Sequence, residues 1–85
     1  MATVTINLDQ NHRSTVRAVE ADSILTCIKT SAADVYTRGV LKDEQHDLRP
    51  DESMIVKGGS TVTVRLFRTK QGDAPFSAEL SLVSK

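Results

Sequence analysis

Apolar and polar residues alternate in several parts of this chain, and the alternation predicts β-strands. In residues 3–8, TVTINL, every second residue is apolar, as expected for a strand with one buried face. Residues 14–20 resume a strand-like pattern after a polar turn, so these two segments predict a hairpin. The most regular alternation lies in residues 61–67, which we expect to form a central strand paired in parallel with residues 3–8. Its outward residues are then Thr61, Thr63, Arg65 and Phe67.

One segment, residues 23–38, has the spacing of a helix instead. Its apolar residues recur three or four positions apart, at Leu25, Ile28, Ala32, Val35 and Tyr36. Asp22 or Ser23 can cap the start of such a helix, because either side chain accepts a hydrogen bond from a free backbone N–H. Gly39 can end it. We therefore predict one amphipathic helix over residues 23–38 that covers one face of a sheet.

The remaining segments predict short strands and connections. Val40 and Leu41 begin a short third strand, and Gly58-Gly59 forms a tight turn before residues 61–67. The order of elements predicts an α+β domain over residues 1–68, a mixed sheet of four to five strands with one helix packed across it. Residues 69–85 form a linker and a C-terminal tail. The tail alternates again and is compatible with an added edge strand.

Two stretches of the chain resemble ubiquitin. Residues 19–29, VEADSILTCIK, resemble the stretch in which a ubiquitin strand ending in Val-Glu turns into a helix, and residues 54–67, MIVKGGSTVTVRLF, resemble its end. The resemblance covers roughly residues 2–68 and implies the ubiquitin-like β-grasp fold. Ubiquitin and the sulfur carriers related to it end in Gly-Gly, whereas the only Gly-Gly here, residues 58–59, precedes the last strand of that domain. The resemblance therefore implies a non-conjugating domain, and a modifier or sulfur carrier is the disfavoured alternative.

The resemblance also implies a role. Domains that resemble ubiquitin often serve as the N-terminal heads of larger scaffold or cytoskeletal proteins. Arg65 stands where ubiquitin has an exposed apolar residue, so the resemblance does not extend to recognition by ordinary ubiquitin-binding modules.

The charge balance changes which partners are expected. Eleven basic and eleven acidic residues cancel, so the chain has no long-range attraction for nucleic acid or anionic lipid. No apolar run approaches the length of a membrane span. The single cysteine, Cys27, excludes an internal disulfide and fits a reducing compartment. With 85 residues, the chain is long enough for one domain. We expect a cytoplasmic protein, or a cytoplasmic domain of a larger one, with no membrane partner.

No cluster of residues indicates catalysis, a metal or a cofactor. Cys27 has no histidine near it in the sequence and is expected to act as a small, partly buried hydrophobic residue. His46 lies among acidic residues, but consecutive charges in a loop usually point into water instead of converging on a metal. Gly58-Gly59 lacks the helix that a phosphate-binding loop requires. We therefore expect a protein that is not an enzyme and that uses no cofactor.

The sequence favours docking of another protein through the exposed face of residues 61–67. An outward aromatic residue beside arginines is typical of binding hot spots. The residues expected to contact the partner are Thr63, Arg65, Phe67 and Arg68, with Leu41 as a neighbour. Two alternatives stay open: Phe67 packs under residues 76–83 in a purely structural role, or residues 64–70 bind nucleic acid weakly by base stacking. An edge strand could also pair with a partner strand or with a second copy of the chain.

Overall fold

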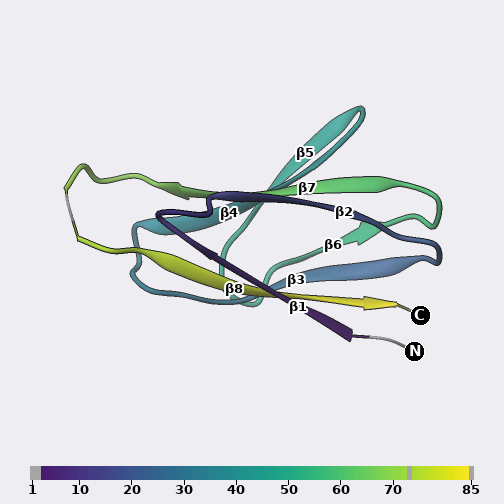
Figure 1. Ribbon diagram of the computed structural model, residues 1–85, viewed down its shortest axis with the longest axis horizontal. Coiled ribbons are helices and arrows are strands. Elements are labelled where there is room, and N and C mark those ends of the chain that lie inside the picture. Colours follow the sequence, from purple (N-terminus) through teal and green to yellow (C-terminus); the bar gives the residue numbers. More distant parts are fainter. Residues whose placement is uncertain (1–2, 73, 85) are drawn as a thin grey trace.

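The computed structural model describes residues 3–72 and 74–84, which form two four-stranded antiparallel sheets facing each other (Figure 1). The described residues contain no helix. The eight strands are β1 (Thr3–Asp9), β2 (Ser14–Ala18), β3 (Ser23–Thr30), β4 (Val35–Leu41), β5 (Glu44–Leu48), β6 (Ser53–Val56), β7 (Thr61–Arg68) and β8 (Ser77–Ser84). The molecule is therefore a β-sandwich.

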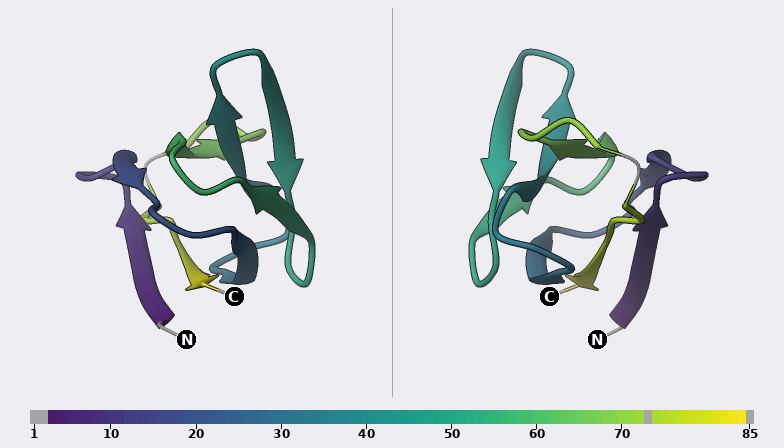
Figure 2. Two further views of the ribbon diagram at one scale, coloured as in Figure 1. Left: turned by 90° about the vertical axis from the view of Figure 1, so that its right-hand side faces the viewer. Right: turned by 90° about the vertical axis from the view of Figure 1, so that its left-hand side faces the viewer.

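The order of the strands is that of a jelly roll. Sheet A has the order β1-β8-β3-β6 and sheet B the order β2-β7-β4-β5, so most consecutive strands cross from one sheet to the other. Only β4 and β5 are consecutive and paired, and their hairpin extends beyond the other strands (Figures 1 and 2). Strands β1, β6, β2 and β5 lie at the edges of the two sheets.

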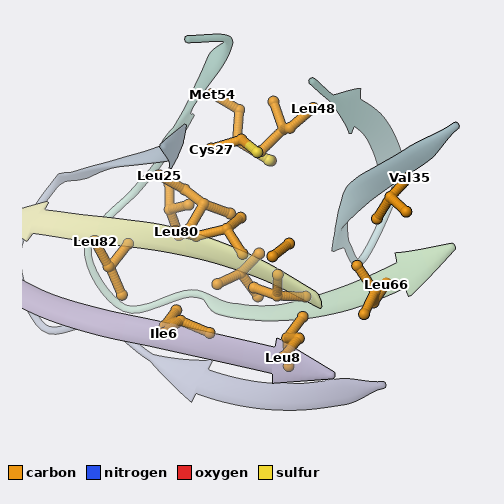
Figure 3. Close-up of a cluster of buried hydrophobic side chains, with 14 of the residues drawn as sticks. Ile6, Leu8, Leu25, Cys27, Val35, Leu48, Met54, Leu66, Leu80 and Leu82 are labelled. Atoms are coloured by element: carbon orange, nitrogen blue, oxygen red, sulfur yellow. The ribbon is translucent and has the colours of Figure 1, made fainter. Parts of the chain in front are cut away.

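The core lies between the two sheets and is built largely from aliphatic side chains (Figure 3). Strands β1, β3, β4, β6, β7 and β8 contribute alternate residues to it, because successive side chains of a strand point to opposite faces, whereas β5 contributes only Leu48 and β2 contributes none. Leu25 on β3 and Leu80 on β8 are completely buried. The alternation in residues 61–67 is confirmed, and so is that in residues 3–8 for Ile6 and Leu8, since the structure buries Ile6, Leu8, Val62, Val64 and Leu66; Val4, near the start of β1, is 40% exposed.

The predicted helix over residues 23–38 is wrong, because this segment forms β3, a turn and most of β4. Burial alternates along β3 up to Cys27, and the pairing of β3 with β8 then shifts by one residue at Ile28. This bulge, followed by the turn at residues 31–34, puts the apolar residues of two strands at helix-like intervals. The segment is also rich in β-branched and aromatic residues, which favour strands.

The predicted α+β, ubiquitin-like β-grasp fold is therefore wrong, since the structure has two packed sheets instead of one sheet under a helix. The expected parallel pairing of residues 3–8 with residues 61–67 is also wrong, because β1 and β7 belong to different sheets. Gly39 does not end a helix; it is a buried residue in the middle of β4. Asp22 does not cap one either, since its carboxylate accepts a hydrogen bond from the Gly58 N–H at 2.8 Å.

The C-terminal tail belongs to the core of this fold. Strand β8 lies between β1 and β3 and pairs with both of them, so it is an inner strand of sheet A and not an added edge strand. Its alternate residues Ala78, Leu80 and Leu82 are buried. Strand β7 has the corresponding inner place in sheet B, between β2 and β4.

Candidate functional site

The outer face of sheet B gathers most of the residues that the sequence indicated for binding. Residues directly opposite each other on paired strands point to the same face of a sheet. On β7, Thr63, Arg65 and Phe67 alternate with buried residues and therefore point outward. On β4, their cross-strand partners are Val40, Arg38 and Tyr36. The inner strands of sheet B thus present a Val–Thr, an Arg–Arg and a Tyr–Phe pair in turn along one outward face.

Two aromatic rings and two guanidinium groups stack in a row on this face. The ring centres of Tyr36 and Phe67 lie 5.4 Å apart, with an angle of 18° between the ring planes. Arg38 lies over the Phe67 ring at 4.6 Å, and Arg49 over the Tyr36 ring at 5.3 Å. We call these four residues the arginine–aromatic ladder. Phe67 is therefore held by Tyr36 and Arg38 on the outer face, which argues against the alternative that it packs under residues 76–83.

The centre of the face carries uncompensated positive charge. Arg38 and Arg65 are directly opposite each other on β4 and β7, a like-charge pair that is unfavourable by itself. Arg38 is compensated because its Nε lies 2.6 Å from Asp47 Oδ1, and this hydrogen bond raises the pKa of Arg38 above its usual value. Arg65 is exposed and has no ion pair with any described residue. An anionic group placed over Arg65 would relieve this repulsion.

All the arginines of the chain lie in sheet B or one residue from its strands. They are Arg13, Arg17, Arg38, Arg49, Arg65 and Arg68. Two of the three aromatic residues, Tyr36 and Phe67, are on the same sheet. The net charge of zero therefore conceals an arginine-rich layer, which the composition alone did not reveal.

A basic pocket lies at one end of the face. Its lining includes Arg65 and Phe67 of the face together with Arg13, Lys70 and Phe76. Arg13 lies over the Phe76 ring at 4.9 Å, and Arg68, which also lines the pocket, lies over it at 5.5 Å. The end of β7 therefore adds cationic side chains to those of the face.

Arg68 mainly holds the fold together. Its Nε donates to Asp34 Oδ2 at 3.0 Å and its Nη1 to the Ala74 carbonyl oxygen at 2.9 Å, which joins β7 to the turns on either side. Its side chain is only 17% exposed. Of the predicted contact residues, Arg68 is thus the one whose hydrogen-bonding groups are already used inside the molecule.

An apolar groove lies at the opposite end of the face. Its lining combines the apolar side chains of Val40, Leu41 and Ile55 with Thr63 of β7 and with charged side chains of both signs, Lys42, Asp43, Glu44 and Lys57. Lys42, Asp43 and Glu44 of this lining belong to the β4–β5 hairpin, which projects from the rest of the molecule in Figure 2. The structure thus places Thr63 at the groove and Arg65 and Phe67 in the basic pocket, so these three predicted site residues form one continuous band along β7. Leu41 also lines the groove, but it lies on β4 and packs against the core.

The Asp34–Arg68 pair predicts a specific dependence of stability on pH. The hydrogen bond from Arg68 holds the pKa of Asp34 below its ordinary value of 3.8, although burial acts in the opposite direction. Because this carboxyl group binds a proton more readily in the unfolded chain, its contribution is fully present above pH 3.8. We expect it to be lost as the pH falls through the lower pKa of the folded state.

The measurement is the urea midpoint of the wild type and of Asp34→Asn between about pH 7 and pH 2. The variant should be less stable at neutral pH, and the two midpoints should converge at the acidic end. A difference that stays constant over the whole range would show that the ionised carboxylate of Asp34 is not the cause.

The groups considered for catalysis lie away from this face or do not converge. Cys27 is completely buried in the core, and burial raises the pKa of its thiol. His46 lies 3.3 Å from Glu44, and His12 lies 3.6 Å from Asp9 on the β1–β2 turn. Among the described residues, no three histidine, cysteine, aspartate or glutamate side chains are placed to hold a metal ion. Nor does any helix in this part of the chain have the length and apolar character to cross a membrane.

Comparison with known proteins adds no family to this description. No protein-family model, curated protein or solved structure matches the chain. The fold that the ubiquitin resemblance implied is absent, so no function is carried over from that resemblance.

Sequence reasoning missed the half of the face that β4 supplies. The predicted helix over residues 23–38 puts Tyr36 on its buried stripe and contains Arg38, so it places neither residue beside β7. A usable signal was present in residues 35–41, VYTRGVL, where β-branched and aromatic residues are frequent and Val35, Thr37 and Gly39 alternate with Tyr36 and Arg38.

Proposed function

We propose that this chain is a non-catalytic binding module that docks an extended, acidic segment of another protein on the outer face of sheet B. The observation that carries the proposal is Arg65, which is exposed, lies opposite Arg38 and has no ion pair with a described residue. A partner carboxylate at this point would neutralise Arg65 and reduce its repulsion of Arg38.

The dimensions of the band suit a peptide strand. The face from Thr61 to Phe67 extends for about 20 Å, at about 3.4 Å per residue, which matches roughly six residues of an extended segment. The groove at Leu41 would accept an apolar side chain at one end, and the basic pocket would accept acidic groups at the other. The partner's sequence should therefore combine a large aliphatic residue with several aspartates or glutamates.

The arginine–aromatic ladder favours a protein partner over a single-stranded nucleic acid. Stacking on a base requires an open aromatic face. Here Tyr36 and Phe67 cover one face of each other, and Arg38 and Arg49 lie over the rings as well. Tyrosine and arginine on a rigid sheet are, by contrast, common anchors of protein interfaces. Nucleic acid binding is therefore the weaker of the two alternatives.

The test uses a fluorescein-labelled peptide of about eight residues with leucines at one end and glutamates at the other, long enough to span the band. Fluorescence anisotropy is expected to detect binding of this peptide, and no binding of the matched peptide with lysine in place of glutamate. In the double variant Arg65→Glu, Phe67→Ala, the affinity should fall at least about tenfold, because the central charge is reversed and the ladder is broken.

Arg17→Glu is the matched control, because it makes the same charge change on β2 without touching the band. It should leave the peptide affinity within about twofold, since a distant exposed charge is screened. Circular dichroism should give the same β spectrum for all three proteins. Equal loss in the two variants would mean that only net charge matters. Tighter binding of an oligothymidine than of the acidic peptide would favour the nucleic-acid alternative instead.

A further inference from the structure

Strand β1 forms one of the two edges of sheet A, and this edge is uncharged from Thr3 to Leu8. Its only partner strand is β8, so its other side is unpaired. From Thr3 to Leu8 it has no charged residue and no proline, and its register with β8 runs without a bulge. Charged residues, prolines and bulges are the features by which natural proteins protect an edge against pairing with another strand. Their absence makes β1 the candidate for an interaction surface.

The direction of the free backbone groups on β1 follows from its two ends. Asp9 and His12 exchange two backbone hydrogen bonds. The N···O distance is 3.2 Å for the bond that Asp9 donates and 3.0 Å for the bond that it accepts, so the N–H and C=O of Asp9 point away from β8. Because this direction alternates along an antiparallel strand, the N–H and C=O groups of Thr3, Thr5 and Asn7 also point to the open edge. On β8, the Ser77 carbonyl oxygen accepts a hydrogen bond from the Ser31 N–H, on the side of β3. Ser77, which is the partner of Asp9, therefore also directs this group away from the β1–β8 pairing.

The other edges are protected by at least one of the usual devices. Strand β2 carries Arg17, and β5 carries Glu44, His46 and Asp47 in only five residues. Strand β6 has four residues and runs directly into Lys57 and the Gly58-Gly59 turn. Among the edge strands of the described residues, only β1 combines length with a neutral stretch, Thr3 to Leu8, and a neutral strand meets no like charge when it faces its own copy.

We propose that two copies of this chain pair through β1, antiparallel and about a twofold axis at Thr5, so that their sheets A join. In this register Thr5 faces its own copy, Thr3 faces Asn7 of the partner, and the free backbone groups of all three residues are satisfied. Val4, which is 40% exposed, lies opposite Ile6 of the partner in this register. The interface is small, so the dimer should be weak and depend on concentration.

This interface lies on sheet A and does not use the face proposed to bind acidic peptides. Dimerisation and peptide binding can therefore fail independently. If both occur, the dimer presents two binding faces, and a partner with two acidic segments gains affinity by avidity.

Sedimentation equilibrium from about 1 to about 200 µM measures the association. The wild type is expected to shift from monomer to dimer over this range. Thr5→Pro removes the central outward N–H without touching the bonds to β8, so it should keep the β spectrum and raise the dissociation constant at least about thirtyfold. Thr5→Lys, which sets two lysines against each other at the axis, should raise it at least about tenfold and is the second variant if the proline disturbs folding.

Val16→Pro is the matched control on β2. The Arg13 carbonyl accepts from Leu66 and the Val19 N–H donates to Ser60, so the alternate Val16 N–H points to the open edge of sheet B. This variant should dimerise like the wild type. The proposal would be overturned if the wild type stays monomeric or if both Thr5 variants still dimerise. It would also be overturned if Val16→Pro weakens the dimer as much as the Thr5 substitutions do. Species larger than a dimer would also overturn it, because a twofold interface closes.

Discussion

A chain that ends at Arg68 is expected to remain unfolded. The truncation removes β8, which lies between β1 and β3, so sheet A would lose the strand that joins its two parts. It also removes four core side chains, those of Phe76, Ala78, Leu80 and Leu82. A domain of this size has only a few kcal/mol of net stability, and losing several buried residues exceeds that margin.

The measurements are far-UV circular dichroism and the dispersion of amide signals in NMR. The full chain should give a β spectrum and a cooperative thermal transition, and the truncated chain neither. A cooperative transition in the truncated chain would instead favour a complete domain within residues 1–68, with residues 69–85 as an appended tail.

A point substitution gives the graded version of the same test. Leu80→Ala removes a completely buried side chain that faces Ile6 and Cys27 on the neighbouring strands, and it should cost about 2–5 kcal/mol of unfolding free energy. Ser81→Ala, the next residue on the same strand, lies on the outer face and should change stability by less than about 0.5 kcal/mol. Similar effects at the two positions would contradict the inner position of β8.

Gly39→Val is expected to destabilise the protein by about 1–3 kcal/mol, although valine favours strands over glycine by up to about 1 kcal/mol. Gly39 is buried in β4, and a Cβ atom there would overlap Met54 Sδ of β6 and lie 3.3 Å from Leu25 Cδ2 of β3. The two sheets therefore approach closely at this point. The cost of overpacking should outweigh the gain in strand propensity. A lower free energy of unfolding in this variant would therefore show that Gly39 is packed against the opposite sheet.

Met54→Ala provides the internal control for this prediction. By itself it should be destabilising, because Met54 is buried and its removal leaves a cavity. Combined with Gly39→Val it should restore part of the lost stability, with a coupling of about 1–3 kcal/mol in a double-mutant cycle followed by urea denaturation. Additive effects would mean that the two positions are not in contact. A stabilising Gly39→Val would mean that Gly39 is not packed against the opposite sheet.

Part of the candidate site could be predicted from residues near each other in the chain. The alternation in residues 61–67 identified Thr63, Arg65 and Phe67 as outward residues of one strand, and the structure places them so. It could not identify the neighbours of this strand, because Tyr36 and Arg38 are far away in the sequence and join β7 only through sheet pairing. The ladder and the uncompensated charge of Arg65 are therefore properties of the assembled sheet.

The sequence by itself determined which residues of β1 and β7 face inward, because a period of two fixes the two faces of a strand whatever the strand pairs with. It did not determine the second sheet. The bulge at Ile28 and the turn after β3 gave two strands the spacing of one helix, and the partners of β8 lie at the opposite end of the chain. Only the tertiary structure decided these points, because strand pairing is selected by burial over the whole sandwich and not by local propensity.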